Sequence, residues 1–203
     1  MGPAVFRKAA ELTRLLACWC ADHRPGGQGD MAIQKNFSCF VIGSDGLLIE
    51  CAEILLRQGH AIRGVVSDAP RITRWAREHG LDTIDPAKGY VEPLARQPFD
   101  YLFSITYLDV IPDEVLALPT QGAINFHDGP LPRYAGLNAP AWALLQGETS
   151  YGITWHRIGS KVDAGDILKQ VTFDLLPDET SLSLNTKCFA HAIETFGELV
   201  TEL

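Results

Sequence analysis

"FSCFVIGSDGLLIECAEILLRQGHAIRGVVS", residues 37–67, indicates the fold class of this chain. Its first part, 37–43, is a short apolar run that ends in glycine, as a buried strand does. Residues 47–59 have apolar side chains at helical spacing and stop at Gly59, which is a common helix terminator. Residues 61–67 are predominantly apolar again and predict a second strand. A strand, a helix and a strand in this order predict two parallel strands joined by a crossover helix.

The same alternation continues along the chain and extends the prediction to a whole sheet. We therefore expect an α/β fold with a Rossmann-like, doubly wound, mostly parallel sheet, in which ligands bind outside the carboxyl ends of the strands. The two last strands are expected to pair across the turn 159–165, and Asp178 or Thr180 is expected to cap the terminal helix. The expected helices are 71–80, 90–97 (broken by Pro93), 112–118, 141–148 and 178–203, and the expected further strands are 99–106, 122–126, 151–158 and 166–175.

The composition is that of an acidic globular protein. Of 203 residues, 46% are hydrophobic and 21% are charged, and the formal net charge is −8. No basic run marks a nucleic-acid surface, so neither DNA nor tRNA is an expected partner. No apolar run reaches transmembrane length, so no membrane partner is expected either. The five scattered cysteines form no metal-ligand pattern and favour reduced thiols in the cytoplasm.

Residues 1–30 are expected to be an N-terminal extension and linker, followed by the main domain at 31–203. Residues 3–21 have amphipathic helical spacing, and 24–30 are rich in glycine. The run Leu15–Cys18 is similar to a lipoprotein cleavage site, but Arg14 and Glu11 interrupt the apolar stretch before it. Secretion is therefore not expected.

The sequence IGSDG, residues 42–46, lies between the first strand and the helix after it. This position suits phosphate binding by the N–H groups of a helix start. The stretch holds only Gly43 and Gly46, however, and does not match the three-glycine dinucleotide fingerprint. We expect a plain tight turn here.

The strongest signal for chemistry is "GAINFHDGPLPRYAGLNAP", residues 122–140, in which a strand ends in polar residues. Asn125 and His127 are two positions apart and point to the same side of a strand. Histidine acts as an acid or base near neutral pH, and an asparagine amide can donate a hydrogen bond to a developing oxyanion. Asp163 is suited to orient the imidazole or to accept its proton. The alternative is a turn that uses these polar residues for local hydrogen bonds, and spacing alone leaves both open.

The remaining histidines are interpreted as structural. His156 alternates with Thr154 and Ile158, which favours an ordinary strand position. No serine or cysteine stands in a recognisable nucleophile setting, so covalent catalysis is not expected. The other histidines with this interpretation are His23, His60, His79 and His191.

Residues 125–170 resemble the core of the folate-dependent formyltransferases, a family that includes methionyl-tRNA formyltransferase and glycinamide ribonucleotide transformylase. The resemblance covers roughly 37–203 and is strongest over 122–170. His127 and Asp163 are 36 positions apart, the separation expected in that family. The motif parts are Asn125-Phe-His127, Leu131-Pro132, Trp142, Gly152-Ile-Thr154 and Asp163-Ala-Gly165-Asp166.

The resemblance implies a formyltransferase fold and an enzyme that moves the formyl group of 10-formyltetrahydrofolate, its co-substrate, to a primary amine. It implies that Asn125 binds the formyl oxygen, that His127 stabilises the oxyanion and protonates the leaving nitrogen, and that Asp163 holds His127 and relays the proton of the amine. It also implies that the folate is bound by Ser104, Ile105, Thr106, Tyr107, Leu108, Leu131, Pro132, Ile158, Gly159, Ser160, Lys161 and Val162.

One departure concerns the acceptor. Many family members have His-x-Ser-Leu-Leu-Pro where this chain has His127-Asp128-Gly129-Pro130-Leu131-Pro132. The sequence of this loop is most similar to that of formyltransferase-like domains at the start of nonribosomal peptide and polyketide synthases. The added C-terminal domain of tRNA formyltransferases is not expected here, and the stretch 42–48 does not contain the Gly-Ser-Asn phosphate loop of the purine enzyme. An aminoacyl group on a carrier protein in a biosynthetic assembly line is thus the expected acceptor.

Two other functions stay open at the level of sequence. A structural or docking domain can retain the fold without catalysis, and a hydrolase uses water in place of the amine.

Overall fold

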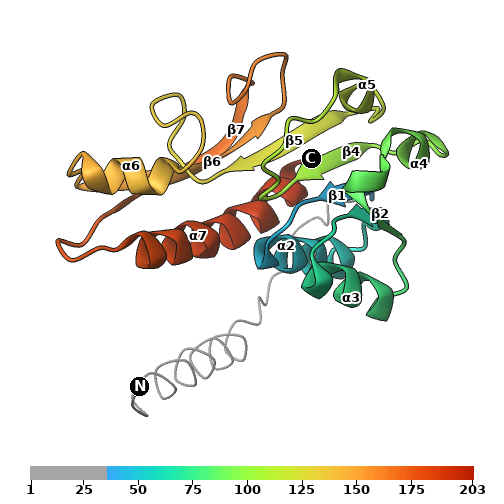
Figure 1. Ribbon diagram of the computed structural model, residues 1–203, viewed down its shortest axis with the longest axis horizontal. Coiled ribbons are helices and arrows are strands. Elements are labelled where there is room, and N and C mark those ends of the chain that lie inside the picture. Colours follow the sequence, from blue (N-terminus) through green and yellow to red (C-terminus); the bar gives the residue numbers. More distant parts are fainter. Residues whose placement is uncertain (1–35) are drawn as a thin grey trace, which may run out of the picture. The chain divides into compact units, whose positions relative to one another are not determined.

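The computed structural model describes residues 36–203, which form a seven-stranded sheet with helices on both faces (Figure 1). The expectations for residues 1–30 lie outside the described residues. The strand order is β3-β2-β1-β4-β5-β6-β7, parallel as far as β5 and antiparallel for β6 and β7. The predicted doubly wound, mostly parallel sheet is confirmed, and so is the pairing of the last two strands.

The elements follow the predicted order along the chain. No helix within residues 36–203 is long and apolar enough to cross a lipid bilayer. The strands are β1 (Ser38–Ile42), β2 (Ala61–Val66), β3 (Thr83–Ile84), β4 (Tyr101–Ser104), β5 (Gly122–His127), β6 (Ser150–Arg157) and β7 (Ile167–Asp174). The helices are α2 (Gly46–Arg57), α3 (Pro70–Glu78), the 3-10 helix η1 (Pro86–Lys88), α4 (Val91–Ala95), α5 (Asp113–Leu116), α6 (Ala139–Leu145) and α7 (Ser181–Glu202).

Two short elements, β3 and η1, are absent from the sequence-based prediction. β3 has only two residues and pairs with β2 at the edge of the sheet. A strand this short has no alternation of apolar side chains to recognise, because alternation becomes readable over about four residues. Its pairing is decided by where the preceding helix returns the chain to the sheet.

Alternate residues of the strands pack into two cores, one on each face of the sheet. Cys39 and Val41 of β1 face the larger core, which includes side chains of α2, α3, α6 and α7. Phe40 and Ile42 face a smaller core formed with α4 and α5. This alternation follows from the period of two along a strand, and burial on both faces explains the continuous apolar run in the sequence.

Helix α7 is attached to the sheet through Trp155 of β6. The Trp155 indole N–H donates to Thr195 Oγ1 at 3.1 Å, and the ring lies 4.8 Å from that of Phe196. Both aromatic side chains are fully buried. Thr180 caps the helix together with Ser183, as one of the two expected capping residues. The capping box thus fixes where helix α7 begins.

The cysteines in the described part of the chain are buried free thiols, as expected. Burial raises the pKa of Cys39 and Cys51 well above the ordinary thiol range and raises that of Cys188 to about 12. A thiol that stays protonated is a poor nucleophile. Cys18 and Cys20 lie outside the described residues.

The loop after β5 is held to the sheet by the hydroxyl of Thr154. Thr154 Oγ1 donates to the Gly129 carbonyl at 2.8 Å and accepts the Leu131 N–H at 3.2 Å. The Gln170 amide donates both to Thr154 Oγ1 at 2.9 Å and to the Leu131 carbonyl at 3.0 Å. Gly152 permits the close approach of β7, since a Cβ there would lie 2.3 Å from the Val171 carbonyl oxygen. The Gly-x-Thr motif thus joins two strands and one loop.

Replacing Thr154 by valine keeps the shape of the side chain and removes these hydrogen bonds. We expect Thr154→Val to lower the free energy of unfolding by about 1–3 kcal/mol, because buried backbone groups of the loop lose their partners. Urea denaturation measures this difference. Thr201→Val is the matched control: Thr201 is exposed on α7, and its change should stay within about 0.5 kcal/mol. Equal stability of both variants would contradict the role given to Thr154.

Candidate active site

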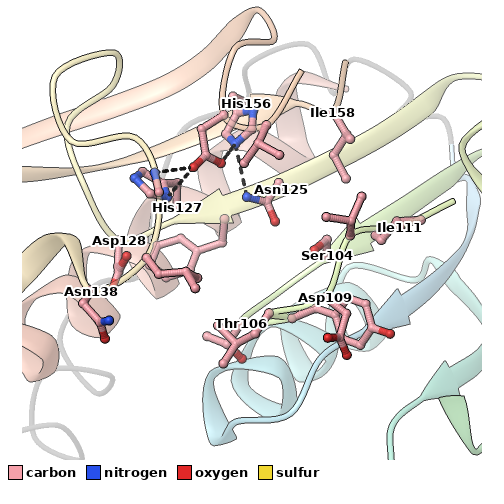
Figure 2. A pocket seen from close by; sticks show the side chains of 18 of the residues that line it. Ser104, Thr106, Asp109, Ile111, Asn125, His127, Asp128, Asn138, His156 and Ile158 are labelled. Carbon is pink, nitrogen blue, oxygen red and sulfur yellow. Dashed lines mark hydrogen bonds and ion pairs between the residues drawn. The ribbon is translucent and has the colours of Figure 1, made fainter. Parts of the chain in front are cut away.

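Asn125 and His127 lie at the carboxyl end of β5 and face away from the larger core. Ile124 and Phe126, which alternate with them, pack into that core. His127 is buried with 6% of its surface exposed, while Asn125 is half-buried. Figure 2 shows both side chains turned toward a pocket that continues past Ser104 at the end of β4. The strand register thus brings two polar side chains to one side, as their spacing predicts.

His156 lies directly opposite Asn125 across the β5–β6 ladder. Asn125 Nδ2 and His156 Nε2 are 3.1 Å apart, and His156 Nδ1 is 2.8 Å from the Arg157 carbonyl oxygen. A carbonyl oxygen only accepts hydrogen bonds, so Nδ1 carries the proton and Nε2 accepts from the Asn125 amide. His156 occupies a strand position in β6, as predicted, and its ring in addition contacts two predicted site residues, Asn125 and Asp163.

Asp163 reaches the same place through the loop that joins β6 to β7. Its carboxylate oxygens lie 3.6 Å from His127 Nδ1 and 3.5 Å from His156 Nε2. The loop folds back tightly at Gly165, where a Cβ would lie 1.8 Å from the Arg157 carbonyl oxygen. The glycine of the Asp-x-Gly motif is thus required for the close approach that returns the chain over the sheet.

The environment of Asp163 favours its charged form. The Gly136 N–H donates to Asp163 Oδ2 at 2.8 Å. Burial raises the pKa of Asp163, but the contact with His156, the Gly136 N–H, and the positive charge of His127 and of His156 when these rings are protonated outweigh burial and hold the pKa below its usual range. Asp163 is consequently a carboxylate at neutral pH, placed between two imidazole rings.

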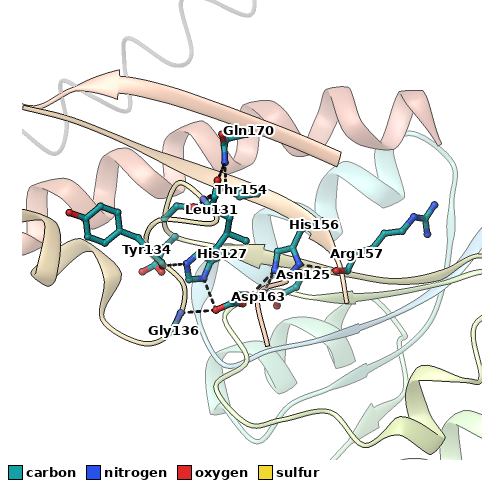
Figure 3. Close-up of polar contacts among 12 residues, drawn as sticks. Asn125, His127, Leu131, Tyr134, Gly136, Thr154, His156, Arg157, Asp163 and Gln170 are labelled. Atoms are coloured by element: carbon teal, nitrogen blue, oxygen red, sulfur yellow. Dashed lines mark hydrogen bonds and ion pairs between the residues drawn. The ribbon is translucent and has the colours of Figure 1, made fainter. Parts of the chain in front are cut away.

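The His127 ring is oriented from its other side by the backbone of Tyr134 (Figure 3). His127 Nε2 lies 2.5 Å from the Tyr134 carbonyl oxygen, so Nε2 carries a proton and donates it. Nδ1 then faces Asp163 and is the nitrogen at which the ring gains or loses a proton. Gly129 packs under the ring, where a Cβ would lie 3.0 Å from Nε2.

These side chains form one wall of a pocket of about 660 Å³ at the carboxyl ends of β4 and β5. This size is within the range of sites that enclose small organic ligands. Most of the sequence-predicted site residues lie together there. They are Asn125, His127, Asp163, Ser104, Thr106, Tyr107, Leu108, Ile158, Gly159, Ser160, Lys161 and Val162.

Three predicted folate-contacting residues do not line the pocket. Ile105 is fully buried in the larger core. Leu131 is buried with its backbone bonded to Thr154 and Gln170, so it supports the loop from behind. Pro132 follows Leu131 in a cis peptide bond and is exposed away from the pocket. The structure thus assigns the Leu-Pro turn to the scaffold of the site.

Several pocket residues have no local sequence signal. Ile111 and Leu116 reach the pocket from the β4–α5 connection and from α5, and Asn185 and Phe189 reach it from α7. His156 comes opposite Asn125 through the antiparallel pairing of β5 with β6, which the sequence pattern does not predict, and residues opposite each other across a ladder have their side chains on one face.

Within residues 36–203, three residues other than glycine have positive φ, and all three line the pocket. They are Thr106 at 56°, Asn138 at 59° and Asp163 at 51°. A β-branched residue such as threonine is rare in this region of backbone space. Thr106 is held there from the β1–α2 loop, since Ser44 Oγ donates to its carbonyl oxygen at 2.8 Å. Backbone strain of this kind is concentrated at functional sites, which supports the assignment of this pocket as the active site.

The expected tight turn at residues 42–46 is present. Gly43 lies against the end of β4, where a Cβ would be 1.8 Å from the Ile105 carbonyl oxygen. Asp45 is the N-cap of α2, and its own side chain accepts the Gly46 N–H. The start of this helix therefore already has a carboxylate ligand from within the chain.

Comparisons with solved structures agree with the observed fold. The chain is similar to glycinamide ribonucleotide transformylase 1 from Symbiobacterium toebii, with 23% identity, a TM-score of 0.74, and coverage of 86% of this chain and 91% of that one. It is also similar to WlaRD, a sugar 3N-formyl transferase, with 16% identity, a TM-score of 0.69, and coverage of 83% and 64%. A formyltetrahydrofolate deformylase from Pseudomonas syringae pv. tomato matches at 16% identity and a TM-score of 0.71, over 81% and 60% of the two chains.

The sequence itself matches a family model. Residues 88–198 match the family described as formyl transferase, and this range includes Asn125, His127, His156 and Asp163. The match extends over more than half of the chain. The chain therefore belongs to the formyl transferase family.

Proposed function

We propose that this chain transfers the formyl group of 10-formyltetrahydrofolate to a primary amine. The observation that carries the proposal is the group of Asn125, His127 and Asp163, held in one wall of a pocket of about 660 Å³. The assignment is supported by the family and by two similar structures whose names include the formyl-folate: one contains 5-N-formyl-tetrahydrofolate and the other is a formyltetrahydrofolate deformylase.

The pocket has the chemistry that a folate requires. Ile111, Leu116 and Ile158 provide apolar surface for a flat ring. The backbone of 104–108 and 158–162 supplies N–H and C=O groups beside it, since both segments line the pocket outside regular strands for most of their length. Flat heterocycles bind between apolar faces, with their polar edges on backbone groups. We propose that this side of the pocket holds the formyl donor.

Asn125 is the proposed donor to the formyl oxygen. One N–H of its amide is taken by His156 Nε2, which orients the group and leaves the second N–H for the pocket. An oriented neutral donor stabilises negative charge that develops on the oxygen without needing to reorganise. His156 is thus a positioning residue that acts through Asn125.

His127 and Asp163 are the proposed proton-transfer pair. His127 Nδ1, protonated and facing Asp163, stabilises the developing oxyanion and delivers a proton to the departing folate nitrogen. The Asp163 carboxylate keeps the imidazolium in place and accepts the proton that the attacking amine releases, through a water molecule. The amine thereby gains the formyl group and loses one proton, while the folate nitrogen regains one.

For the acceptor, we propose an aminoacyl group tethered to a carrier protein. This finer assignment rests on the sequence of the loop after His127 and on an apolar rim beside the pocket. Leu137, Trp142 and Leu145 are 65%, 56% and 78% exposed around α6. Incubation of aminoacylated carrier protein with the chain and 10-formyltetrahydrofolate should add one formyl group to the intact mass. Release of formate without a formylated amine would show a hydrolase instead.

We further propose that residues 31–203 form the catalytic domain and that residues 1–30 are an extension of it.

Substitutions in the site should abolish turnover without unfolding the protein. We expect His127→Ala, and Asp163→Asn, to reduce kcat by about 100-fold or more, because each removes a group that acts in the proton transfers. Stopped assays of formyl-folate consumption measure this. The Kd of 5-formyltetrahydrofolate should change little, which separates chemistry from binding. His79→Ala, at an exposed pair with Glu53 far from the site in sequence, is the matched histidine control. Unchanged turnover in His127→Ala would remove the proposed mechanism.

The pH dependence should follow the acceptor amine. Because the pKa of Asp163 lies below its usual range, this carboxylate stays ionised at mildly acidic pH and does not itself titrate there. Activity should still fall in acid, because only the unprotonated amine attacks. An α-amino acceptor, with a pKa of about 8, should keep activity to lower pH than an alkylamine acceptor, with a pKa of about 10. Measurement of kcat/KM against pH with each of the two acceptors tests this prediction. If kcat/KM falls at the same pH for both acceptors, the prediction is wrong.

A further inference from the structure

Asp128 lies next to His127 at the other side of the pocket from the proposed folate position. Figure 2 shows Asp128 and Asn138 on one side of His127, and Ser104, Ile111 and Ile158 on the other. Asp128 and Asn138 both line the pocket. An acceptor that enters beside the formyl donor therefore meets Asp128 as it approaches His127.

The Asp128 carboxylate has no lysine or arginine partner among residues 36–203. Burial is the largest effect on the pKa of Asp128 and raises it. The charge of His127 and the residue's own backbone N–H lower this pKa, whereas the charge of Asp163 raises it. The result is a pKa above the usual range of an aspartate. Such a carboxylate has lost part of its hydration without gaining a fixed cation in exchange. His127 does not satisfy it fully, because Nδ1 faces Asp163 and Nε2 donates to the Tyr134 carbonyl.

Two segments of the chain, 136–141 and 181–189, contribute only uncharged side chains to the pocket that Asp128 also lines. Leu137, Pro140 and Ala141 come from the loop before α6 and from α6 itself, and Phe189 comes from α7. The polar residues of these segments in the lining are Asn138, Ser181 and Asn185, which are neutral. Such a lining beside a carboxylate suits an ammonium group on a short apolar body.

The same surface is unsuited to an acceptor with an anionic group near its amine. The aspartates that line the pocket are Asp45, Asp109, Asp113, Asp128 and Asp163, against the cation of Lys161 in the loop 158–162. The start of α2, where a phosphate would find helix N–H groups, is capped by the Asp45 carboxylate. A phosphate or carboxylate here would meet five aspartates, and Lys161 is the lysine or arginine in the described lining that could compensate them.

We propose that Asp128 is the specificity-determining residue for the acceptor: it binds the ammonium group of an amine that carries no phosphate or carboxylate beside it. An aminoacyl ester, thioester or amide has this chemistry, whereas a free amino acid or a phosphorylated amine does not. The amine binds as R–NH3+, releases one proton to water, and then attacks the formyl carbon, so no bond to Asp128 forms or breaks. The inference rests on the proposed function, since it assigns a role to a residue of that same site.

The test compares three primary amines as acceptors for the full chain and its variants. Valinamide represents the aminoacyl group, valine adds a carboxylate, and phosphoethanolamine carries a phosphate. Asp128→Asn removes the charge while keeping the shape. Asp174→Asn is the control, because it removes an exposed carboxylate at the end of β7 that does not line the pocket.

We expect the wild-type chain to favour valinamide over valine and phosphoethanolamine by about tenfold or more in kcat/KM, since a buried charge contact is worth about one such factor. Asp128→Asn should raise KM for valinamide by about tenfold with a small effect on kcat, and should reduce the preference. Asp174→Asn should leave the ratio between the acceptors unchanged. Binding of 5-formyltetrahydrofolate, measured by calorimetry, should be the same in Asp128→Asn and wild type within about twofold.

Calorimetric titration of valinamide into protein saturated with 5-formyltetrahydrofolate gives a readout that does not depend on turnover. Heat of binding in wild type and its loss in Asp128→Asn support the inference. Formylation of valinamide with equal KM in wild type and Asp128→Asn, or equal use of phosphoethanolamine, overturns the inference and leaves the proposed function intact. Failure to bind 5-formyltetrahydrofolate, or release of formate with every amine unmodified, overturns the proposed function and this inference with it.

Discussion

The Asp163 carboxylate between two imidazole rings is the interaction on which the rest of the site depends. Taking a charged carboxylate out of water costs several kcal/mol unless partners replace the lost hydration. Here the partners are the Gly136 N–H at 2.8 Å and the rings of His127 and His156 at 3.6 and 3.5 Å. Each ring is in turn oriented by a backbone carbonyl, Tyr134 for His127 and Arg157 for His156. The protonated nitrogen of each neutral ring is therefore set by the backbone. At His127 the other nitrogen faces Asp163 and is left for chemistry, whereas at His156 it also accepts from the Asn125 amide.

The scaffold that holds this group is built from close backbone approaches. Gly43, Gly152 and Gly165 each stand where a Cβ would lie within 2.3 Å of a carbonyl oxygen of another segment. Thr106, Asn138 and Asp163 have positive φ angles, and Asp163 shares its loop with Gly165. Conformations of this kind cost of order 1–3 kcal/mol each and persist only where the surroundings fix them. The hydrogen bonds of Thr154 and Gln170 are part of those surroundings, because they attach the loop after β5 to β6 and β7.

Charge divides the proposed roles of the pocket between its two sides. Asp163 gains enough partners to keep its pKa low, whereas Asp128, on the other side of His127, is partly desolvated and has a raised pKa. The two carboxylates that flank the His127 imidazole thus differ in their partners. Asp163 has hydrogen-bond and ion-pair partners within the protein, and Asp128 is proposed to find its partner in the acceptor. In a family whose similar structures include a ribonucleotide transformylase, a sugar formyltransferase and a deformylase, the acceptor side is where individual chains must differ.

The linear pattern was sufficient for everything that depends on local periodicity and short spacing. The alternation from residue 37 onward predicted the doubly wound sheet, and the spacing of Asn125 and His127 placed both on one side of β5. Boundaries shifted by a few residues, and the two-residue strand β3 was missed, because an edge strand of that length is selected by its neighbour and has no pattern of its own. Locating Asp163 in the site needed the family resemblance, since 36 positions separate it from His127.

Folding decided what depends on contacts between distant segments. The register of β5 against β6 places His156 in contact with Asn125 and Asp163, which its position in the strand pattern alone did not indicate. The return of the chain at Gly165 brought Asp163 over the sheet, and the packing of α7 brought Phe189 to the pocket. Ile105, Leu131 and Pro132 do not line the pocket, and this too is decided by how distant segments pack. The period of two along a strand is a property of that strand alone and can be read from the sequence. Register, burial and electrostatic environment depend on contacts between two segments, and these contacts form only when the chain has folded.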